Sequence, residues 1–113
     1  MRIAVSSSGP DLDSAVDPRF GRCAFLIFVE TETMDYEAMQ NSNASAGGGA
    51  GISTAQVVAD KGIEAVITGN VGPNAYGVLN QAGITTHTGA AGTVRQAVES
   101  FKAGGFGTTQ SPT

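Results

Sequence analysis

The segment from Asp17 to Cys23 is the part of the chain whose residue types could do chemistry. It reads Asp-Pro-Arg-Phe-Gly-Arg-Cys, so Arg19 and Arg22 lie beside the only thiol of the chain. A guanidinium group is weakly hydrated and has several hydrogen-bond donors, which suits a large and diffuse anion. We therefore predict a local positive site with a soft ligand, although the whole chain has a net charge of −4.

These candidate residues also have structural interpretations. The arginines could pair with nearby carboxylates, which are Asp11, Asp13 and Asp17. Cys23 could be a buried core residue, since free cysteines are usually buried. His87, the only histidine, ends a predicted strand and could be structural. Alternatively, Cys23 or His87 could bind a soft or borderline metal such as copper, because thiolate and imidazole suit it. Phe20 fits a core position better than a contact position.

Two glycine-rich segments could add backbone N–H donors to this site. Residues 47–51 read Gly-Gly-Gly-Ala-Gly and residues 69–73 read Gly-Asn-Val-Gly-Pro, each before a predicted helix. The first segment lacks the lysine of a phosphate loop and the glycine spacing of a dinucleotide fingerprint. Helix N-termini still attract anions. The candidate binding residues here are Gly48, Gly49, Asn70 and Gly72, and a flexible connector is the alternative for the first segment.

The sequence argues against several catalytic chemistries. An EF-hand loop that begins at Asp11 would need a glycine at position 16 and a glutamate at position 22, where the chain has Val16 and Arg22. The predicted strands at 2–7 and 65–68 contain no acid for a two-metal nuclease. No Gly-x-Ser-x-Gly motif is present. We therefore predict a protein that is not an enzyme.

Composition limits the class of protein and its partners. The 113 residues suit one domain, which we assign to residues 1–103, with a flexible tail at 104–113. The acidic balance does not favour binding to nucleic acid or to an anionic membrane. No apolar run approaches the roughly 20 residues of a membrane span. The start of the chain resembles a strand rather than a signal peptide, so we expect a cytoplasmic protein. We also expect a monomer.

Eight elements are expected to position the candidate residues. Strands are predicted at 2–7, 24–30, 34–40, 65–68 and 84–87, and helices at 53–61, at 73–82 and from a capping box at Thr93 to about residue 103. Strand–helix units in the second half imply parallel strands. We predict an α/β fold with a mixed five-stranded sheet of order 3-2-1-4-5, an antiparallel second strand and helices on both faces. Ligands bind beyond the carboxyl ends of such strands, where residues 8–22, 69–73 and 88–93 begin.

Three motifs together resemble the dinitrogenase iron–molybdenum cofactor biosynthesis family, which includes NifX-like proteins and the carboxyl-terminal domain of NifB. They occupy residues 17–23, 47–52 and 69–75, and the likeness extends over residues 1–103. The resemblance implies an RNase H-like three-layer sandwich that binds or carries a metal–sulfur cofactor without changing it. Many members have a histidine at the position of Arg19. A permanent cation here implies that charge and hydrogen bonds, rather than coordination, hold the cofactor.

The resemblance also implies what is bound. The small single-domain member that this sequence most resembles carries a molybdenum–copper sulfide cluster, and a precursor of the iron–molybdenum–sulfur type is the alternative. The implied cofactor-binding residues on the first motif are Arg19, Phe20, Gly21 and Arg22, with Phe20 as an apolar wall. A protein partner in cluster delivery is implied as well.

Two other functions stay open at this stage. One is a partner-binding or regulatory module without a cofactor, which could dock through the exposed strand edge at 34–40. The other is a small enzyme that uses Cys23 as a nucleophile, with His87 as a conceivable base. Nothing in the sequence brings these two residues together.

Overall fold

A computed structural model of the chain describes residues 1–42 and 49–107. The element order is the predicted one, three strands followed by helices that alternate with strands. Their bounds are β1 Arg2–Ser7, β2 Phe25–Glu30, β3 Tyr36–Gln40, α1 Ala50–Asp60, β4 Ala65–Ile67, α2 Pro73–Gln81, β5 Thr85–His87 and α3 Val94–Lys102.

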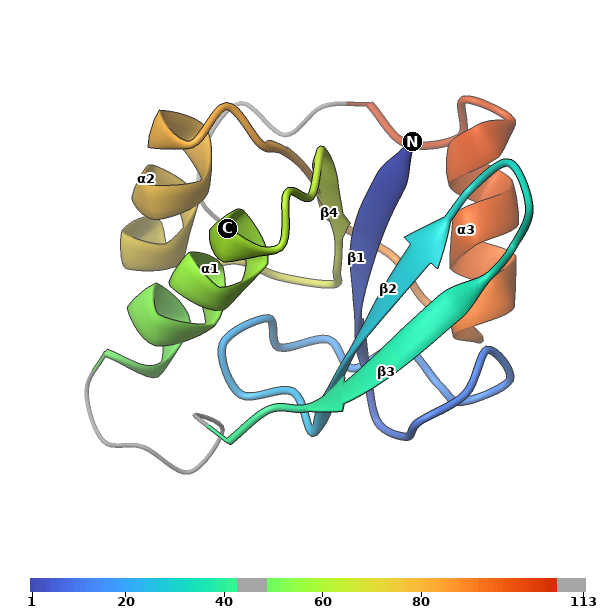
Figure 1. The fold of residues 1–113 in the computed structure, drawn as a ribbon, viewed down its shortest axis with the longest axis horizontal. Coiled ribbons are helices and arrows are strands. Elements are labelled where there is room, and N and C mark those ends of the chain that lie inside the picture. Colours follow the sequence, from blue (N-terminus) through green and yellow to red (C-terminus); the bar gives the residue numbers. More distant parts are fainter. Residues whose placement is uncertain (43–48, 108–113) are drawn as a thin grey trace.

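The five strands form one mixed sheet in the order β3-β2-β1-β4-β5, which confirms the predicted topology. β1, β4 and β5 are parallel to one another, and β2 is antiparallel to both of its neighbours. Helices α1 and α2 cover one face and α3 covers the other, so the molecule has three layers (Figure 1). The carboxyl ends of the parallel strands therefore meet at a single edge of the sheet, at the bottom of Figure 1.

Each face of the sheet has its own hydrophobic core. The core under α1 and α2 includes Phe28, Val58 and Leu79, and the core under α3 includes Ile27 and Val98. Consecutive residues of β2 alternate between the two cores, which explains its nearly continuous apolar sequence. Burial on both faces fixes the register of β2, because a slip by one residue would exchange the two cores.

The start of α1 differs from the predicted one. The sequence suggests a capping box at Ser53–Gln56, but the helix begins at Ala50 and its N-cap is Gly49 in a left-handed conformation with φ 98°. Ala50 is buried and Ser53 N–H donates to the Gly49 carbonyl, so packing of the first turn overrides the local signal. The predicted box at Thr93 is confirmed, because its side chain accepts from Gln96 N–H.

The end of the described chain packs on α3. Gly105 N–H donates to the Ser100 carbonyl at 2.7 Å, and Phe106 packs against the core under α3. The rest of the predicted tail, residues 108–113, and the candidate residue Gly48 lie outside the described residues. Within the described part of the chain, no helix is long and apolar enough to cross a membrane.

Candidate functional site

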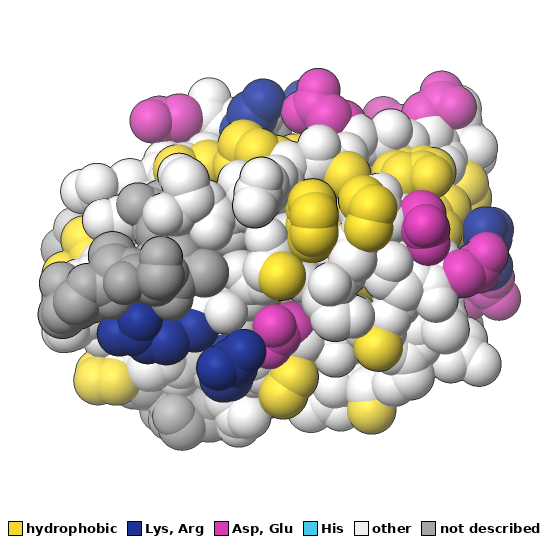
Figure 2. Space-filling model, turned by 90° about the horizontal axis from the view of Figure 1, so that it is seen from below, with side chains coloured by type: hydrophobic (Ala, Val, Ile, Leu, Met, Phe, Trp, Pro, Cys, Tyr) yellow, Lys and Arg dark blue, Asp and Glu magenta, His cyan; other side chains and the backbone are white. Residues whose placement is uncertain are grey.

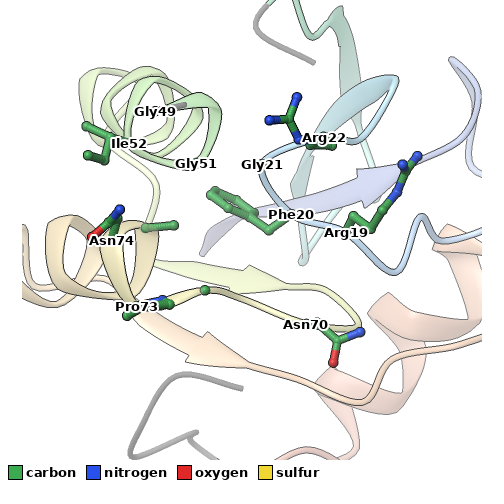
Figure 3. A pocket seen from close by; sticks show the side chains of 12 residues that line it. Arg19, Phe20, Gly21, Arg22, Gly49, Gly51, Ile52, Asn70, Pro73 and Asn74 are labelled. Atoms are coloured by element: carbon green, nitrogen blue, oxygen red, sulfur yellow. The ribbon is translucent and has the colours of Figure 1, made fainter. Parts of the chain in front are cut away.

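A pocket of about 360 Å³ lies at the carboxyl edge of the parallel strands (Figure 3). Three segments form its walls: residues 19–22, the first turn of α1 with its cap, and residues 70–75 at the start of α2. We call residues 17–23 the arginine loop. The described lining residues are Arg19, Phe20, Gly21, Arg22, Gly49, Gly51, Ile52, Asn70, Gly72, Pro73, Asn74 and Ala75.

The arginine loop is fixed to the segment between β4 and α2. Asn70 N–H donates to the Pro18 carbonyl at 2.7 Å, and Phe20 N–H donates to the Asn70 carbonyl at 3.2 Å. These bonds form a short parallel bridge between Arg19 and Asn70. The backbones approach closely at Gly69, where a Cβ atom would lie 2.6 Å from Pro18 Cα. Glycine is therefore required there for the two walls to meet.

A second close approach joins the arginine loop to α1. A Cβ atom on Gly21 would lie 2.7 Å from Gly51 Cα, so the two glycines place the backbones in direct contact. This contact brings the arginines next to the first turn of the helix. The actual start of α1 at Ala50, three residues before the predicted one, is what makes the contact possible.

The first turns of α1 and α2 both face the pocket. Their N-caps are Gly49 and Gly72, and neither helix start has a side-chain cap among the described residues. Neither first turn contains an acidic residue. The N-terminus of a helix carries a partial positive charge and unsatisfied N–H groups. Two such ends therefore give the pocket a preference for anions.

The charged side chains reinforce this preference from the margin of the pocket. Arg19 and Arg22 are exposed and are both among the residues that line the pocket, and Figure 3 shows the Arg19 side chain extending to the side of the loop away from Phe20 and the two helices. Arg19 Nε lies 3.4 Å from Asp17 Oδ1, yet its side chain is 65% exposed. The ion-pair alternative therefore applies to Arg19 in a weak, solvated form. None of the described lining residues is acidic. On this face of the molecule, Figure 2 shows basic side chains gathered beside one another.

The inner wall of the pocket is apolar. Phe20 is only 2% exposed and belongs to the core under α1 and α2. Figure 3 shows its ring pointing from the arginine loop toward the two helices, where Ile52, Pro73 and Ala75 also line the pocket. Phe20 thus has both roles that the sequence suggests, in the core and at the wall. The pocket has charge at its margin and apolar surface inside.

Cys23 is not among the described lining residues. It is completely buried in the core under α1 and α2. Burial is the main cause that raises the pKa of its thiol from 9.0 to about 11, and the nearby Asp17 carboxylate adds to the rise. A buried, protonated thiol is a poor nucleophile and a poor ligand. The geometry therefore favours the structural interpretation of Cys23.

His87 lies on the other side of the sheet from Cys23. Its ring packs edge-on against Phe101 of α3 at 5.0 Å between centroids. Nε2 lies 3.0 Å from Thr85 Oγ1, and Nδ1 lies 3.1 Å from the Gly107 carbonyl oxygen. Both ring nitrogens thus have protein partners, and the arrangement favours a structural role. The described residues contain no cluster of three or more His, Cys, Asp or Glu side chains suited to a metal ion.

The structure brings together most of the predicted cofactor-binding residues. The arginine loop, Gly49, Asn70 and Gly72 all line the pocket, whereas the predicted rim segment at 88–93 does not. Sequence reasoning missed Gly51 and Ile52, because it started α1 too late. It also missed Asn74 and Ala75, although their position directly after the predicted helix start at Pro73 is a usable signal.

Comparison with known proteins shows the family of the chain. The family model described as dinitrogenase iron-molybdenum cofactor matches residues 1–104. The chain belongs to this family. An uncharacterized protein of Methanocaldococcus jannaschii is 30% identical over 107 residues, which are 92% of this chain and 87% of that protein.

Two solved structures are similar over almost the whole of this chain. The apo form of the orange protein from Desulfovibrio gigas is 43% identical, with a TM-score of 0.96 over 99% of this chain and 95% of that one. A NifB-like protein from Thermotoga is 36% identical, with a TM-score of 0.86 over 99% of this chain and 96% of that one. The family that the sequence motifs suggest is thus confirmed.

Proposed function

We propose that the chain is a carrier that binds an anionic metal–sulfur cofactor in the pocket and does not change it chemically. One observation carries the proposal: two helix N-termini and two arginines line one pocket, whose described lining contains no acid. This donor set complements negative charge from several directions.

The pocket chemistry supports a sulfide cluster as the cargo. Sulfide ligands are soft and weakly hydrated, so they tolerate contact with the wall of Phe20 and Ile52. Arg19 and Arg22 would oppose the cluster charge from the margin, and N–H groups near Gly49 and Gly72 would add donors. We propose a molybdenum–copper sulfide cluster, with an iron–molybdenum–sulfur precursor as the alternative. Cys23 and His87 take no part in this proposal, because neither lines the pocket.

Reconstitution tests the proposal directly. The metal-free protein is incubated anaerobically with tetrathiomolybdate and copper, passed through gel filtration, and examined by visible absorption and metal analysis. We expect coloured protein with a stoichiometric metal content. Arg19→Ala should weaken retention, whereas Arg95→Ala, which removes an exposed arginine paired with Asp13, should not. Loss of all metal from the wild type on the column would overturn the proposal.

A second candidate function, docking of a protein partner, is favoured by the position of β3. This strand is an edge of the sheet and is largely exposed. An edge strand offers backbone groups to a partner strand. Co-purification of a partner from metal-free extract, unchanged by Arg19→Ala, would support this function. A partner that is lost on Arg19→Ala would assign the interaction to the pocket instead.

A further inference from the structure

Asn41 follows β3 and is buried beneath the arginine loop, with 6% of its surface exposed. Its Nδ2 lies 3.0 Å from the Cys23 carbonyl oxygen and 3.3 Å from the Gly21 carbonyl oxygen. Its backbone N–H donates to the Ala24 carbonyl at 2.9 Å. The side-chain amide has two N–H donors, so it can serve both loop carbonyls at once. Asn41 therefore binds the two residues that flank Arg22.

Thr54 of α1 completes this buried network. It is fully buried, and its Oγ1 lies 3.3 Å from the Gly21 carbonyl oxygen and 3.4 Å from Asn41 Oδ1. The network thus joins the end of β3, the first half of α1 and the arginine loop. It lies beside the contact of Gly21 with Gly51, so hydrogen bonds and close packing fix the same boundary. Networks of this kind hold a backbone in one arrangement when their members are satisfied.

The orientation of the two carbonyls matters for an anion site. Carbonyl oxygens carry partial negative charge, and those of Gly21 and Cys23 point into the protein toward Asn41. These two carbonyls are therefore held away from an anion in the pocket, whose margin Arg19 and Arg22 line. Without Asn41 the two carbonyls would lose a buried donor and could turn toward water at the pocket margin.

We propose that Asn41 is the positioning residue for Arg22: by holding the carbonyls on both sides of it, Asn41 sets the point from which this guanidinium reaches the anionic guest. The inference rests on the proposed function. It adds the residue that fixes the position of one of the two pocket arginines before an anion binds. Arg19 has a separate support, because its N–H donates to Asp17 Oδ1 at 3.0 Å. The two arginines are thus positioned by different residues.

A double-mutant cycle tests this assignment, with tetrathiomolybdate and copper as the probe. Binding is measured for Asn41→Ala, Arg22→Ala, Arg19→Ala and the two double variants that contain Asn41→Ala. Each Arg→Ala change should weaken binding about tenfold, as expected for loss of a charge-assisted contact. Asn41→Ala should weaken wild-type binding several-fold and Arg22→Ala binding less than twofold. In the Arg19→Ala background, Asn41→Ala should weaken binding as much as it does in the wild type, because the effects of independent sites add.

Further variants separate positioning from a general loss of structure. Thr54→Val keeps the shape of the side chain but removes one donor to Gly21, so we expect a smaller loss, about twofold, that also disappears beside Arg22→Ala. Thr31→Val is the matched control, because it removes a buried hydroxyl that donates to the Met1 carbonyl at the opposite edge of the sheet. It should leave binding unchanged. Circular dichroism establishes whether each variant is folded. If Asn41→Ala does not fold, Thr54→Val tests the proposal in its place.

The outcomes distinguish this inference from the proposed function. Wild-type protein that retains no probe refutes the function itself. Wild-type protein that binds, together with an Asn41→Ala effect that adds in full to Arg22→Ala, refutes only the positioning role. Binding by Asn41→Ala that equals the wild type refutes it as well.

Discussion

The sheet has one cavity at the carboxyl edge of its parallel strands and another at the opposite ends of these strands, and the two cavities have opposite chemistry. The pocket at the carboxyl edge has arginines and helix starts in its walls. A groove of about 230 Å³ at the other edge is lined by Arg2, Phe28, Glu30, Asp35, Tyr36 and Glu37, with no helix start among them. Topology produces the difference, because each strand–helix unit delivers a helix N-terminus to the carboxyl edge. Glu30, Asp35 and Glu37 thus lie where they do not oppose an anion in the pocket. Asp17, within the arginine loop, pairs with Arg19 instead.

Reversal of one charge at the pocket should have the largest effect on binding of the probe. Arg22→Glu places a carboxylate at the pocket margin, and we expect binding of the tetrathiomolybdate–copper probe to fall about a hundredfold. Arg2→Glu makes the same change in charge at the other edge and should alter binding less than twofold. Equal losses in the two variants would show that only the net charge matters. The measurement is the dissociation constant from absorption titration.

The thiol beneath the arginine loop should report how firmly the pocket edge is packed. Because burial raises the pKa of Cys23 from 9.0 to about 11, the unfolded state loses this proton at lower pH than the folded state. The contribution to stability is complete below pH 9 and is lost as the pH rises through 11. We expect a fall of about 2 to 3 kcal/mol in the free energy of unfolding. Urea unfolding from pH 8 to 11 measures it, and Cys23→Ala should flatten the profile.

A change of shape at one helix start should have a smaller effect on binding than charge reversal. A Cβ atom on Gly72 would meet no atom of the described residues within 4 Å, so Gly72→Leu begins in open space beside the pocket. We expect binding to weaken about tenfold, because the added side chain competes with the guest for space. Gly77→Leu adds the same volume at an open position within α2 and is the control. Unchanged binding by Gly72→Leu would place the guest elsewhere.

A change in salt concentration should have the smallest effect on binding. It tests whether the pocket arginines act through their charge. Raising the ionic strength from 0.05 to 0.5 M should weaken wild-type binding about threefold, since exposed charges are screened. The effect should shrink for Arg22→Ala and persist for Arg2→Ala. A salt dependence that is identical in the three proteins would contradict a role for the pocket arginines. Equilibrium dialysis with metal analysis gives the values.

The sequence predicts most of the fold because its signals are local and mutually consistent. The apolar run of β2, the capping box at Thr93 and Pro73 at the first position of α2 each agree with the tertiary structure. The start of α1 is the exception, since no local signal marks Gly49 as a cap. That start accompanies the contact of Gly21 with Gly51, and a contact between residues 30 positions apart leaves no local pattern.

The sequence predicts the motifs that line the candidate site but not the residues that hold these motifs in place. Arg19, Arg22 and Gly72 follow predicted elements at one edge, so topology places them together. Asn41 belongs to no motif, and its partners lie 18 and 20 positions away in the chain. A buried amide that serves distant carbonyls can be identified only once the backbone path is known.

The direct contact of Gly21 with Gly51 limits how the family can vary this site. No side chain fits between the arginine loop and α1, so the pocket cannot be widened or narrowed along that boundary. Room for a guest of another size would have to come from the side of α2, where Gly72 faces open space. A relative whose pocket holds a guest of another size should therefore differ at the start of α2 and agree at these two glycines.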